Sequence, residues 1–183
     1  MTLARASRHI LDLMDSYPDY PSPGILFRDL TPVFSDGPAF ASVVDALAGG
    51  GAADGEVSTT VYDAIAGVEA RGFLLAAAAA YREGCGVIAI RKAGKLPGEV
   101  IGESYELEYS SIKLELHPGR LPAGSRILLV DDLLATGGTL RAAATLVERA
   151  GYVVAGVRVV LELDGLGGRE ALSGYEVTSI ARL

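Results

Sequence analysis

One short stretch of the sequence combines two adjacent acids with a run of small and hydroxyl-bearing residues. Asp131 and Asp132 stand side by side, and Ala135-Thr136-Gly137-Gly138-Thr139 follows two residues later. The backbone N–H groups of a small, glycine-rich loop can converge on one anion, and the positive end of a helix after it would point at the same place. Gly137 would let the backbone approach that anion closely. The stretch therefore predicts a phosphate cradle, to which Thr136 and Thr139 add hydroxyl donors.

The two acids need a role of their own, because carboxylates beside a phosphate would repel it. Carboxylates accept hydrogen bonds from vicinal hydroxyls and attract positive charge that develops on a carbon atom. A ribose 5-phosphate satisfies both features, with its phosphate in the cradle and its 2- and 3-hydroxyls on Asp131 and Asp132. A strand end followed by a capped helix is the plainer alternative, but two acids and a small-residue loop exceed what a cap requires.

Other motifs that bind phosphate or carry out hydrolysis are not supported. The sequence has no Gly-Lys-Ser/Thr after a glycine-rich loop, no His-Glu-x-x-His and no Gly-x-Ser-x-Gly. Gly84–Ala89 matches the dinucleotide-binding pattern in letters, but it precedes a predicted strand instead of following one. His9, on an N-terminal helix, and His117, before a proline, are each more typical of surface residues than of a ligand or a base.

Strands that alternate with helices must position these residues. Such alternation implies a parallel α/β sheet with right-handed crossovers. The run 127–130 is apolar throughout, as in strands buried on both faces. The acids and the cradle therefore fall at the carboxyl end of a central strand, where ligands bind in open α/β sheets. Strands are predicted over 61–66, 87–90, 127–130, 153–163 and 175–181, and helices over 3–14, about 38–47, 71–83 and 139–150.

Less regular segments flank this core. Residues 17–24 carry three prolines and predict an extended chain. Residues 92–98 form a basic loop punctuated by glycine and proline, and residues 99–116 have β character with many charges. The last segment predicts an exposed hairpin or a mobile flap.

Composition limits the class of protein. The 183 residues, half of them hydrophobic and 21% charged, correspond to one domain with a substantial core. The net charge of −7 argues against a general nucleic-acid binder, which needs a basic face. Cys85 is the single cysteine, which fits a reducing cytoplasm, and the first fifteen residues lack the pattern of a signal peptide. The longest apolar run, 73–81, is well short of the ~20 residues that a membrane helix needs. We therefore expect a cytoplasmic protein that binds neither nucleic acid nor membrane.

The stretch Val130–Thr139 resembles the phosphoribosyl pyrophosphate signature of type I phosphoribosyltransferases. Four more segments resemble the adenine phosphoribosyltransferase family, in the order in which that family has them: Phe27–Pro32, Glu69–Phe73, Arg91–Gly98 and Ser104–Tyr109. The resemblance covers nearly the whole chain. It implies a single domain over residues 1–183 with the type I phosphoribosyltransferase fold, an α/β fold whose parallel sheet is flanked by helices. It also implies a small N-terminal hood at about 1–35, a mobile flap hairpin at about 95–114 and a homodimer.

The resemblance further implies the reaction and the roles of individual residues. Members of the family transfer ribose 5-phosphate from phosphoribosyl pyrophosphate to N9 of adenine, giving AMP and pyrophosphate in purine salvage. They use Mg²⁺, held mainly by the substrate. By similarity, the catalytic carboxylates are Glu108 of the flap, Asp131 and Asp132, and the 5-phosphate lies on Ala135, Thr136, Gly137, Gly138 and Thr139. Pyrophosphate would bind Arg71, Lys95 and Lys92, and adenine would bind Leu26, Phe27, Arg28 and Leu163.

The chain departs from the family pattern after Glu108-Tyr109, where Ser110 stands in place of the usual glycine. A serine lacks the positive-φ freedom that would ease bending of the flap, but it removes no charged group. Two other functions stay open: a phosphoribosyltransferase for xanthine or for hypoxanthine and guanine, and a phosphoribosyl pyrophosphate-sensing regulator of the same fold. The segment Phe27–Asp29 argues against the first, and the acidic charge and the lack of a spare domain argue against the second.

Overall fold

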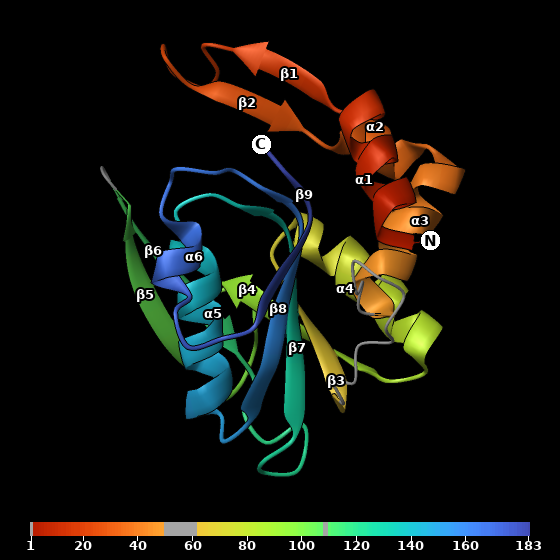
Figure 1. Cartoon of the computed structure of the whole chain (residues 1–183). Helices are drawn as coiled ribbons and strands as arrows, with labels where there is room; N and C mark the ends of the chain where they lie inside the picture. The colour runs from red at the N-terminus through yellow and green to blue at the C-terminus, as the bar shows by residue number, and fades with distance from the viewer. Residues whose placement is uncertain (1, 50–61, 108–109) are drawn as a thin grey trace.

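Five adjacent parallel strands make up most of a seven-stranded sheet in the computed structural model (Figure 1). The structure describes residues 2–49, 62–107 and 110–183. The predicted parallel α/β sheet is therefore confirmed. An antiparallel hairpin extends it at one edge, so that the strand order is β5-β6-β4-β3-β7-β8-β9. The parallel strands are β3 (Ala64–Val68), β4 (Gly86–Lys92), β7 (Arg126–Leu134), β8 (Val153–Glu162) and β9 (Val177–Arg182).

The strand order reverses between β3 and β7. From β3 the chain crosses through α4 (Arg71–Glu83) to β4 on one side, and then forms the hairpin of β5 (Ile101–Leu107) and β6 (Ser110–Leu116). It then returns to β7 on the other side of β3. In open α/β sheets a crevice opens at the carboxyl ends of the strands where the order reverses. The topology therefore places a ligand site beyond the ends of β3 and β7.

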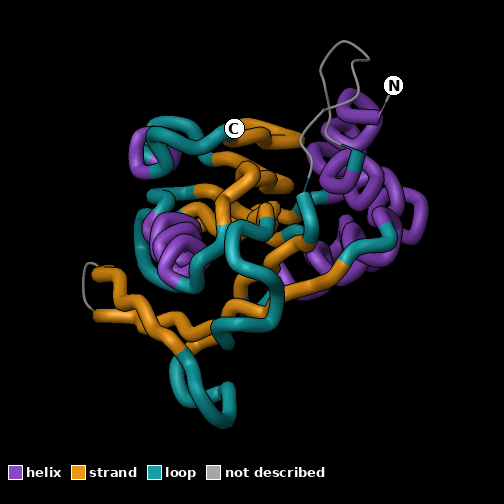
Figure 2. Tube along the Cα trace, turned by 90° about the horizontal axis from the view of Figure 1, so that it is seen from below, coloured by secondary structure: helices purple, strands orange, loops and turns teal. Residues whose placement is uncertain are grey.

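Helices cover both faces of the sheet (Figure 2). On one face α4 packs with α1 (Thr2–Leu13) and α3 (Gly37–Ala48), and on the other lies α5 (Gly138–Arg149). Side chains of β7 alternate between the two layers, because successive residues of a strand point to opposite faces. Leu128 and Val130 pack on the α4 side, and Ile127 and Leu129 on the α5 side. This two-sided burial is what the apolar run 127–130 predicts. The longest described helix, α4, has 13 residues, and none of the described helices is long and apolar enough to cross a membrane.

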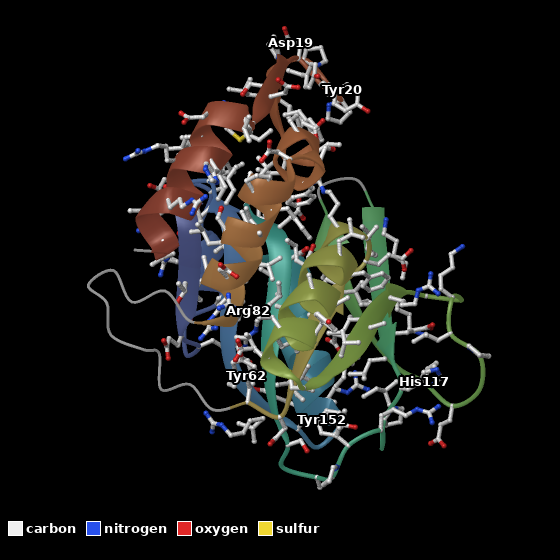
Figure 3. All side chains as sticks on the ribbon, turned by 90° about the vertical axis from the view of Figure 1, so that its right-hand side faces the viewer. Asp19, Tyr20, Tyr62, Arg82, His117 and Tyr152 are labelled. Carbon is white, nitrogen blue, oxygen red and sulfur yellow. The ribbon has the colours of Figure 1, made fainter. Side chains whose placement is uncertain are left out.

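A small antiparallel hairpin precedes the helices α2 (Thr31–Ser35) and α3 and corrects the predicted extended segment. Its strands are β1 (Asp15–Pro18) and β2 (Leu26–Asp29). The chain is extended only to Pro18 and then reverses through Asp19, which has a positive φ of 57°. Proline content alone indicates an extended chain and gives no sign of this reversal. Figure 1 places the hairpin beyond the carboxyl ends of the central strands, and Figure 3 shows Asp19 and Tyr20 at its far end.

The predicted elements around the site are largely confirmed, with one correction. The helix over 71–83 has the predicted bounds and ends at Gly84 in the left-handed conformation. The strand predicted over 61–66 is found at Ala64–Val68, and Val61 lies outside the described residues. The strand predicted over 127–130 continues to Leu134, so both acids lie within β7 and not after it. Ladder bonds between β7 and β8 persist to the last residue of β7 and account for this extension.

Candidate active site

A cavity of about 360 Å³ lies where the strand order reverses. Its wall includes both acids, all five residues of the predicted cradle, Arg71 and Lys92. These residues come from the end of β7 and the start of α5, from the start of α4, and from the end of β4. Residues as far apart in sequence as 71 and 139 thus face one space. The structure therefore brings together most of the predicted phosphate-binding residues.

The cradle loop enters α5 through Gly137, which has φ of 82° and caps the helix. A Cβ at this position would lie 2.8 Å from the carbonyl oxygen of Gly168 and 2.9 Å from the Cβ of Ala171. Gly137 is therefore required by its left-handed backbone and by the packing of α6 (Gly168–Ala171). The missing side chain of Gly137 faces α6, and its role in letting the backbone approach the phosphate stays a prediction.

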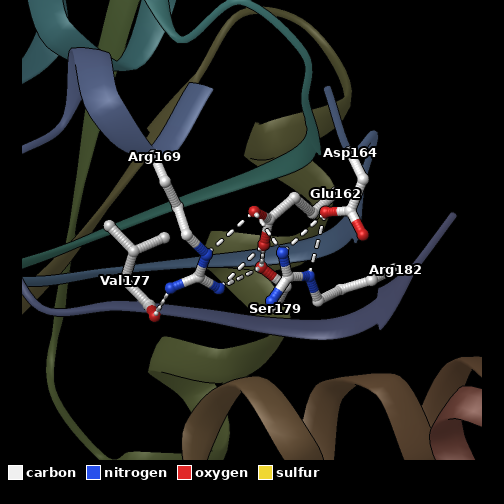
Figure 4. A network of polar contacts seen from close by, with 6 residues as sticks. All are labelled: Glu162, Asp164, Arg169, Val177, Ser179 and Arg182. Atoms are coloured by element: carbon white, nitrogen blue, oxygen red, sulfur yellow. Dashed lines mark hydrogen bonds and ion pairs between the residues drawn. The ribbon is translucent and has the colours of Figure 1, made fainter. Parts of the chain in front are cut away.

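A polar network around the buried Glu162 holds α6 in place behind the cradle (Figure 4). Glu162, at the end of β8, is 4% exposed and accepts hydrogen bonds at 2.8 Å from both Nε and Nη2 of Arg169. Ser179 also donates to Glu162, and Arg182 lies 3.6 Å from it. Burial alone would raise the pKa of Glu162, but the hydrogen bonds from Arg169 and Ser179 hold it below its usual value. Sequence reasoning missed this network, although an acid within the apolar strand predicted over 153–163 signals the need for a partner.

The two acids are tied to each other and to Arg71. The backbone N–H of Asp132 donates to Oδ1 of Asp131 at 2.9 Å, and Oδ2 of Asp132 lies 2.8 Å from Arg71 Nε. That Oδ2 atom is buried and, within the described residues, accepts no hydrogen bond of acceptable geometry. Burial, and then the charge of Asp132, raise the pKa of Asp131 well above its usual value. Burial also raises the pKa of Asp132, and the positive charge of Arg71 partly offsets this. Both carboxyls can therefore accept a hydrogen bond from a hydroxyl group or stabilise a positive charge in the cavity.

The cationic side of the cavity is arranged by Glu69. Arg71 begins α4 directly after a cis peptide between Glu69 and Ala70. Glu69 accepts a hydrogen bond at 2.9 Å from the backbone N–H of Lys92 and lies 3.4 Å from Arg91 Nε. Arg71 Nη1 also lies 3.9 Å from Asp29 at the end of β2. These contacts hold Arg71 and Lys92 in the cavity wall and connect the hairpin of β1 and β2, called the hood hairpin below, to the cavity. Sequence reasoning did not single out Glu69 or Asp29.

Of the remaining predicted residues, those that the structure describes do not line the cavity. Lys95 is exposed, and its carbonyl oxygen accepts a hydrogen bond at 3.2 Å from Arg91. The predicted adenine residues lie on β2 and just after β8, and Glu108 lies outside the described residues. On β2, Phe27 packs edge-on against Tyr20 with ring centroids 5.2 Å apart, and Arg28 donates to Ser16 at 2.6 Å. Leu26 is exposed, and Leu163 is half-buried against the core on the α4 side.

Known proteins with similar sequences and structures belong to a family that binds phosphoribosyl groups, as the residues of the cavity suggest. The model of the phosphoribosyl transferase domain matches residues 34–181. The chain therefore belongs to the phosphoribosyltransferase family.

Individual relatives show to which members of the family the chain is similar. The adenine phosphoribosyltransferase of Clavibacter michiganensis subsp. michiganensis is 63% identical over 178 residues, which cover 97% of both chains. The crystal structure of adenine phosphoribosyltransferase from Thermoanaerobacter pseudethanolicus has a TM-score of 0.88 at 43% identity, and covers 96% of this chain and 99% of that one. The Saccharomyces cerevisiae enzyme, solved with an imino-altritol bisphosphate and adenine, has a TM-score of 0.86 at 39% identity, covering 97% and 99%. Within the family, the chain groups with the adenine phosphoribosyltransferases.

Proposed function

We propose that the chain is a cytoplasmic enzyme that transfers ribose 5-phosphate from phosphoribosyl pyrophosphate to N9 of adenine, giving AMP and pyrophosphate. The main observation behind this proposal is that one cavity is lined by the cradle, by both acids and by two cations. The residues are Ala135–Thr139, Asp131 and Asp132, and Arg71 and Lys92. Relatives named for this activity are more than 60% identical over nearly the full chain.

The two ends of the sugar substrate would bind opposite walls of the cavity. The 5-phosphate would lie on the N–H groups of the cradle at the start of α5, where the helix dipole is positive. Pyrophosphate leaves with several negative charges, so Arg71 and Lys92 would stabilise it as it departs. The ribose ring then spans the space beside β7, with its hydroxyls on Asp131 and Asp132.

The acids have a second role in the transition state. When pyrophosphate departs, positive charge develops on the sugar, so that the transition state resembles an oxocarbenium ion. The raised pKa of Asp131 reflects burial and then the neighbouring carboxylate, so a cation placed beside the pair relieves this repulsion. The pair therefore stabilises the charged transition state more than the neutral ground state, as catalysis requires. A role for Glu108 in handling the N9 proton stays a prediction from the sequence.

Adenine selectivity would come from the hood. The sheet of β1 and β2 has two strands, so among the described residues one edge of β2 has no strand partner. The backbone of Leu26 and Arg28 would use this edge to offer one acceptor to the adenine amino group and one donor to a ring nitrogen. A 6-oxopurine presents the opposite pattern and would leave buried polar groups unpaired. Phe27 and Leu163 would contact the ring faces.

Mg²⁺ would enter with the substrate. Among the described residues, no group of three or more His, Cys, Asp or Glu side chains could hold a metal ion. Asp131 and Asp132 offer two carboxylates in the cavity wall, a donor set that fits Mg²⁺ carried on phosphate oxygens and water. When bound, Mg²⁺ supplies charge neutralisation to the leaving group. Arg71 and Lys92 hold the same group from the side of the protein.

A homodimer is supported by an exposed apolar surface. Leu74 and Tyr81, two turns apart on α4, are 56% and 91% exposed, and Val87 on the neighbouring β4 is 55% exposed. Large apolar side chains that stay this exposed favour an interface. Sedimentation equilibrium should give twice the chain mass, and Tyr81→Glu should shift it toward the monomer.

The product assay tests the proposed reaction directly. The protein is incubated with phosphoribosyl pyrophosphate, Mg²⁺ and each purine base in turn, and nucleotides are separated by chromatography. We expect AMP from adenine and far lower kcat/KM for hypoxanthine and guanine. Comparable kcat/KM for adenine and guanine would contradict the adenine assignment. Binding of phosphoribosyl pyrophosphate without any nucleotide product would favour the regulator.

A further inference from the structure

Tyr105 of the hairpin reaches into the cavity and contacts the cradle. Thr139 Oγ1 donates a hydrogen bond at 2.9 Å to the Tyr105 hydroxyl. The ring lies over Gly138, because a Cβ there would come within 3.3 Å of the Tyr105 ring atom Cδ2. The side chain is half-buried and forms part of the cavity wall. One residue of β5 therefore contacts two consecutive residues of the predicted phosphate loop.

The hairpin is also held to α5 at a second point. Arg149, in the last turn of α5, donates to the carbonyl oxygen of Gly102 at 2.8 Å and pairs with Glu103 at 2.6 Å. Gly102 and Glu103 precede Tyr105 on the same strand. The strand is thus fixed at the far end of α5 by Arg149 and at the cradle end by Tyr105. The position of the Tyr105 hydroxyl is therefore supported by its own contact with the cradle and by the contacts of the residues that precede it.

We propose that Tyr105 is a positioning residue that directs the hydroxyl of Thr139 toward the 5-phosphate, an inference that rests on the proposed function. A hydroxyl can donate one hydrogen bond while it accepts another. Without a ligand, the hydroxyls of Thr139 and Tyr105 share one hydrogen bond. A phosphate in the cradle can only accept, so the Thr139 proton turns to it and the Tyr105 proton turns to Thr139 Oγ1. The result is a chain of two hydrogen bonds, in which each strengthens the other without movement of a heavy atom.

This role differs from that of a tyrosine that merely packs. A packing tyrosine would stabilise the hairpin and would affect every ligand and the fold alike. A positioning tyrosine acts on the phosphate alone, because only Thr139 transmits its effect. Tyr175 provides the matched control, since its hydroxyl also bonds to a residue of α5, Glu148, at 2.9 Å, but lies outside the cavity wall.

The test is Tyr105→Phe, which keeps the ring on Gly138 and removes the hydroxyl. We expect the Kd for AMP and the KM for phosphoribosyl pyrophosphate to rise about three- to tenfold, with an unchanged KM for adenine and an unchanged Tm. Tyr175→Phe should leave all four values unchanged. An unchanged Kd for AMP, or an equal rise in the KM for adenine, would overturn the proposal.

A double-mutant cycle with Thr139→Val separates action through Thr139 from direct contact. If Tyr105 acts through Thr139, Tyr105→Phe has no further effect on AMP binding once Thr139 is replaced. Full additivity of the two losses would refute the positioning role. Failure of the proposed function is distinguishable, because the unmodified protein would then neither bind nor form AMP. If the unmodified protein binds and forms AMP and the Tyr105→Phe variant binds AMP equally well, the proposed function stands and only the inference about Tyr105 fails.

Discussion

The phosphate side and the hood side of the cavity are built in opposite ways. The cradle is backed by α6, by the buried carboxylate of Glu162 and by Arg169, and it follows a strand that is buried on both faces. The hood hairpin is a two-stranded sheet whose residues are exposed or half-buried, with Tyr20 57% and Leu26 48% exposed. On the phosphate side, charge is stabilised best by groups that are already in position before the substrate binds. On the hood side, the planar base must be able to enter and leave. The difference indicates a rigid phosphate site beside an accessible base site.

Gly137→Ala should have the largest effect on the rigid side. The new Cβ would lie 2.8 Å from the carbonyl oxygen of Gly168, at a φ of 82°. We expect a loss of about 2–4 kcal/mol in the free energy of unfolding and a large loss of AMP affinity. Gly151→Ala is the matched control, because Gly151 has the same φ and nothing lies within 4 Å of its Cβ position. It should cost about 1 kcal/mol and leave AMP binding unchanged, as urea unfolding and calorimetry can measure. Equal effects of the two variants would mean that α6 does not support the cradle.

Asp131→Asn should separate rate from stability. Loss of the carboxylate should cost about 1–3 kcal/mol of transition-state stabilisation in kcat/KM. The folded state raises the pKa of Asp131 above that of the unfolded chain, so the folded protein binds more protons in the interval between the two values. Its stability therefore falls as the pH rises through that interval, above about 4. The asparagine variant should escape this fall and be more stable than the unmodified protein at neutral pH. Parallel pH profiles for both proteins, from urea unfolding, would contradict the raised pKa.

The substitutions Arg169→Met and Arg28→Met compare how much a side-chain hydrogen bond stabilises the phosphate side and the hood side. Arg169→Met removes both hydrogen bonds that Arg169 donates to the buried Glu162 and should lower the free energy of unfolding by about 1–3 kcal/mol. Arg28→Met removes a hydrogen bond of similar length to Ser16 in the hood, where the groups are exposed, and should cost about 0.5 kcal/mol or less. A larger loss for Arg28→Met than for Arg169→Met, in chemical denaturation, would reverse the comparison.

The smallest effect on stability is expected for Lys95→Ala, since Lys95 is exposed. The sequence predicts a mobile flap at about 95–114, so limited proteolysis of the free protein should cut first within 95–113, outside the residues 102–105 that contact α5. Phosphoribosyl pyrophosphate with Mg²⁺ should protect this segment, and Lys95→Ala should weaken the protection with little change in Tm. Identical cutting with and without ligands would mean that this hairpin is a static surface and that Lys95 has no role in closure.

Local patterns predicted the elements and the acids well, and contacts between distant segments poorly. The helix over 71–83 follows from its apolar spacing and Gly84, and the site at the end of β7 follows from the apolar run before Asp131. The contact of Tyr105 with Thr139 joins residues 34 positions apart and depends on how the hairpin lies along α5. The family resemblance assigns pyrophosphate first to Lys95 and then to Lys92, but of these two lysines the end of β4 places Lys92 in the cavity wall.

A crystal structure of the complex with AMP tests the account most directly, since AMP fills both sides of the site at once. We predict that its phosphate accepts hydrogen bonds from the N–H groups of the loop Ala135–Thr139, with its ribose hydroxyls on Asp131 and Asp132. The adenine edge should meet the backbone of Leu26 and Arg28 on β2. A phosphate bound between Arg71 and Lys92 instead, or a base that points away from the hood, would contradict the division of the cavity into a phosphate side and a base side.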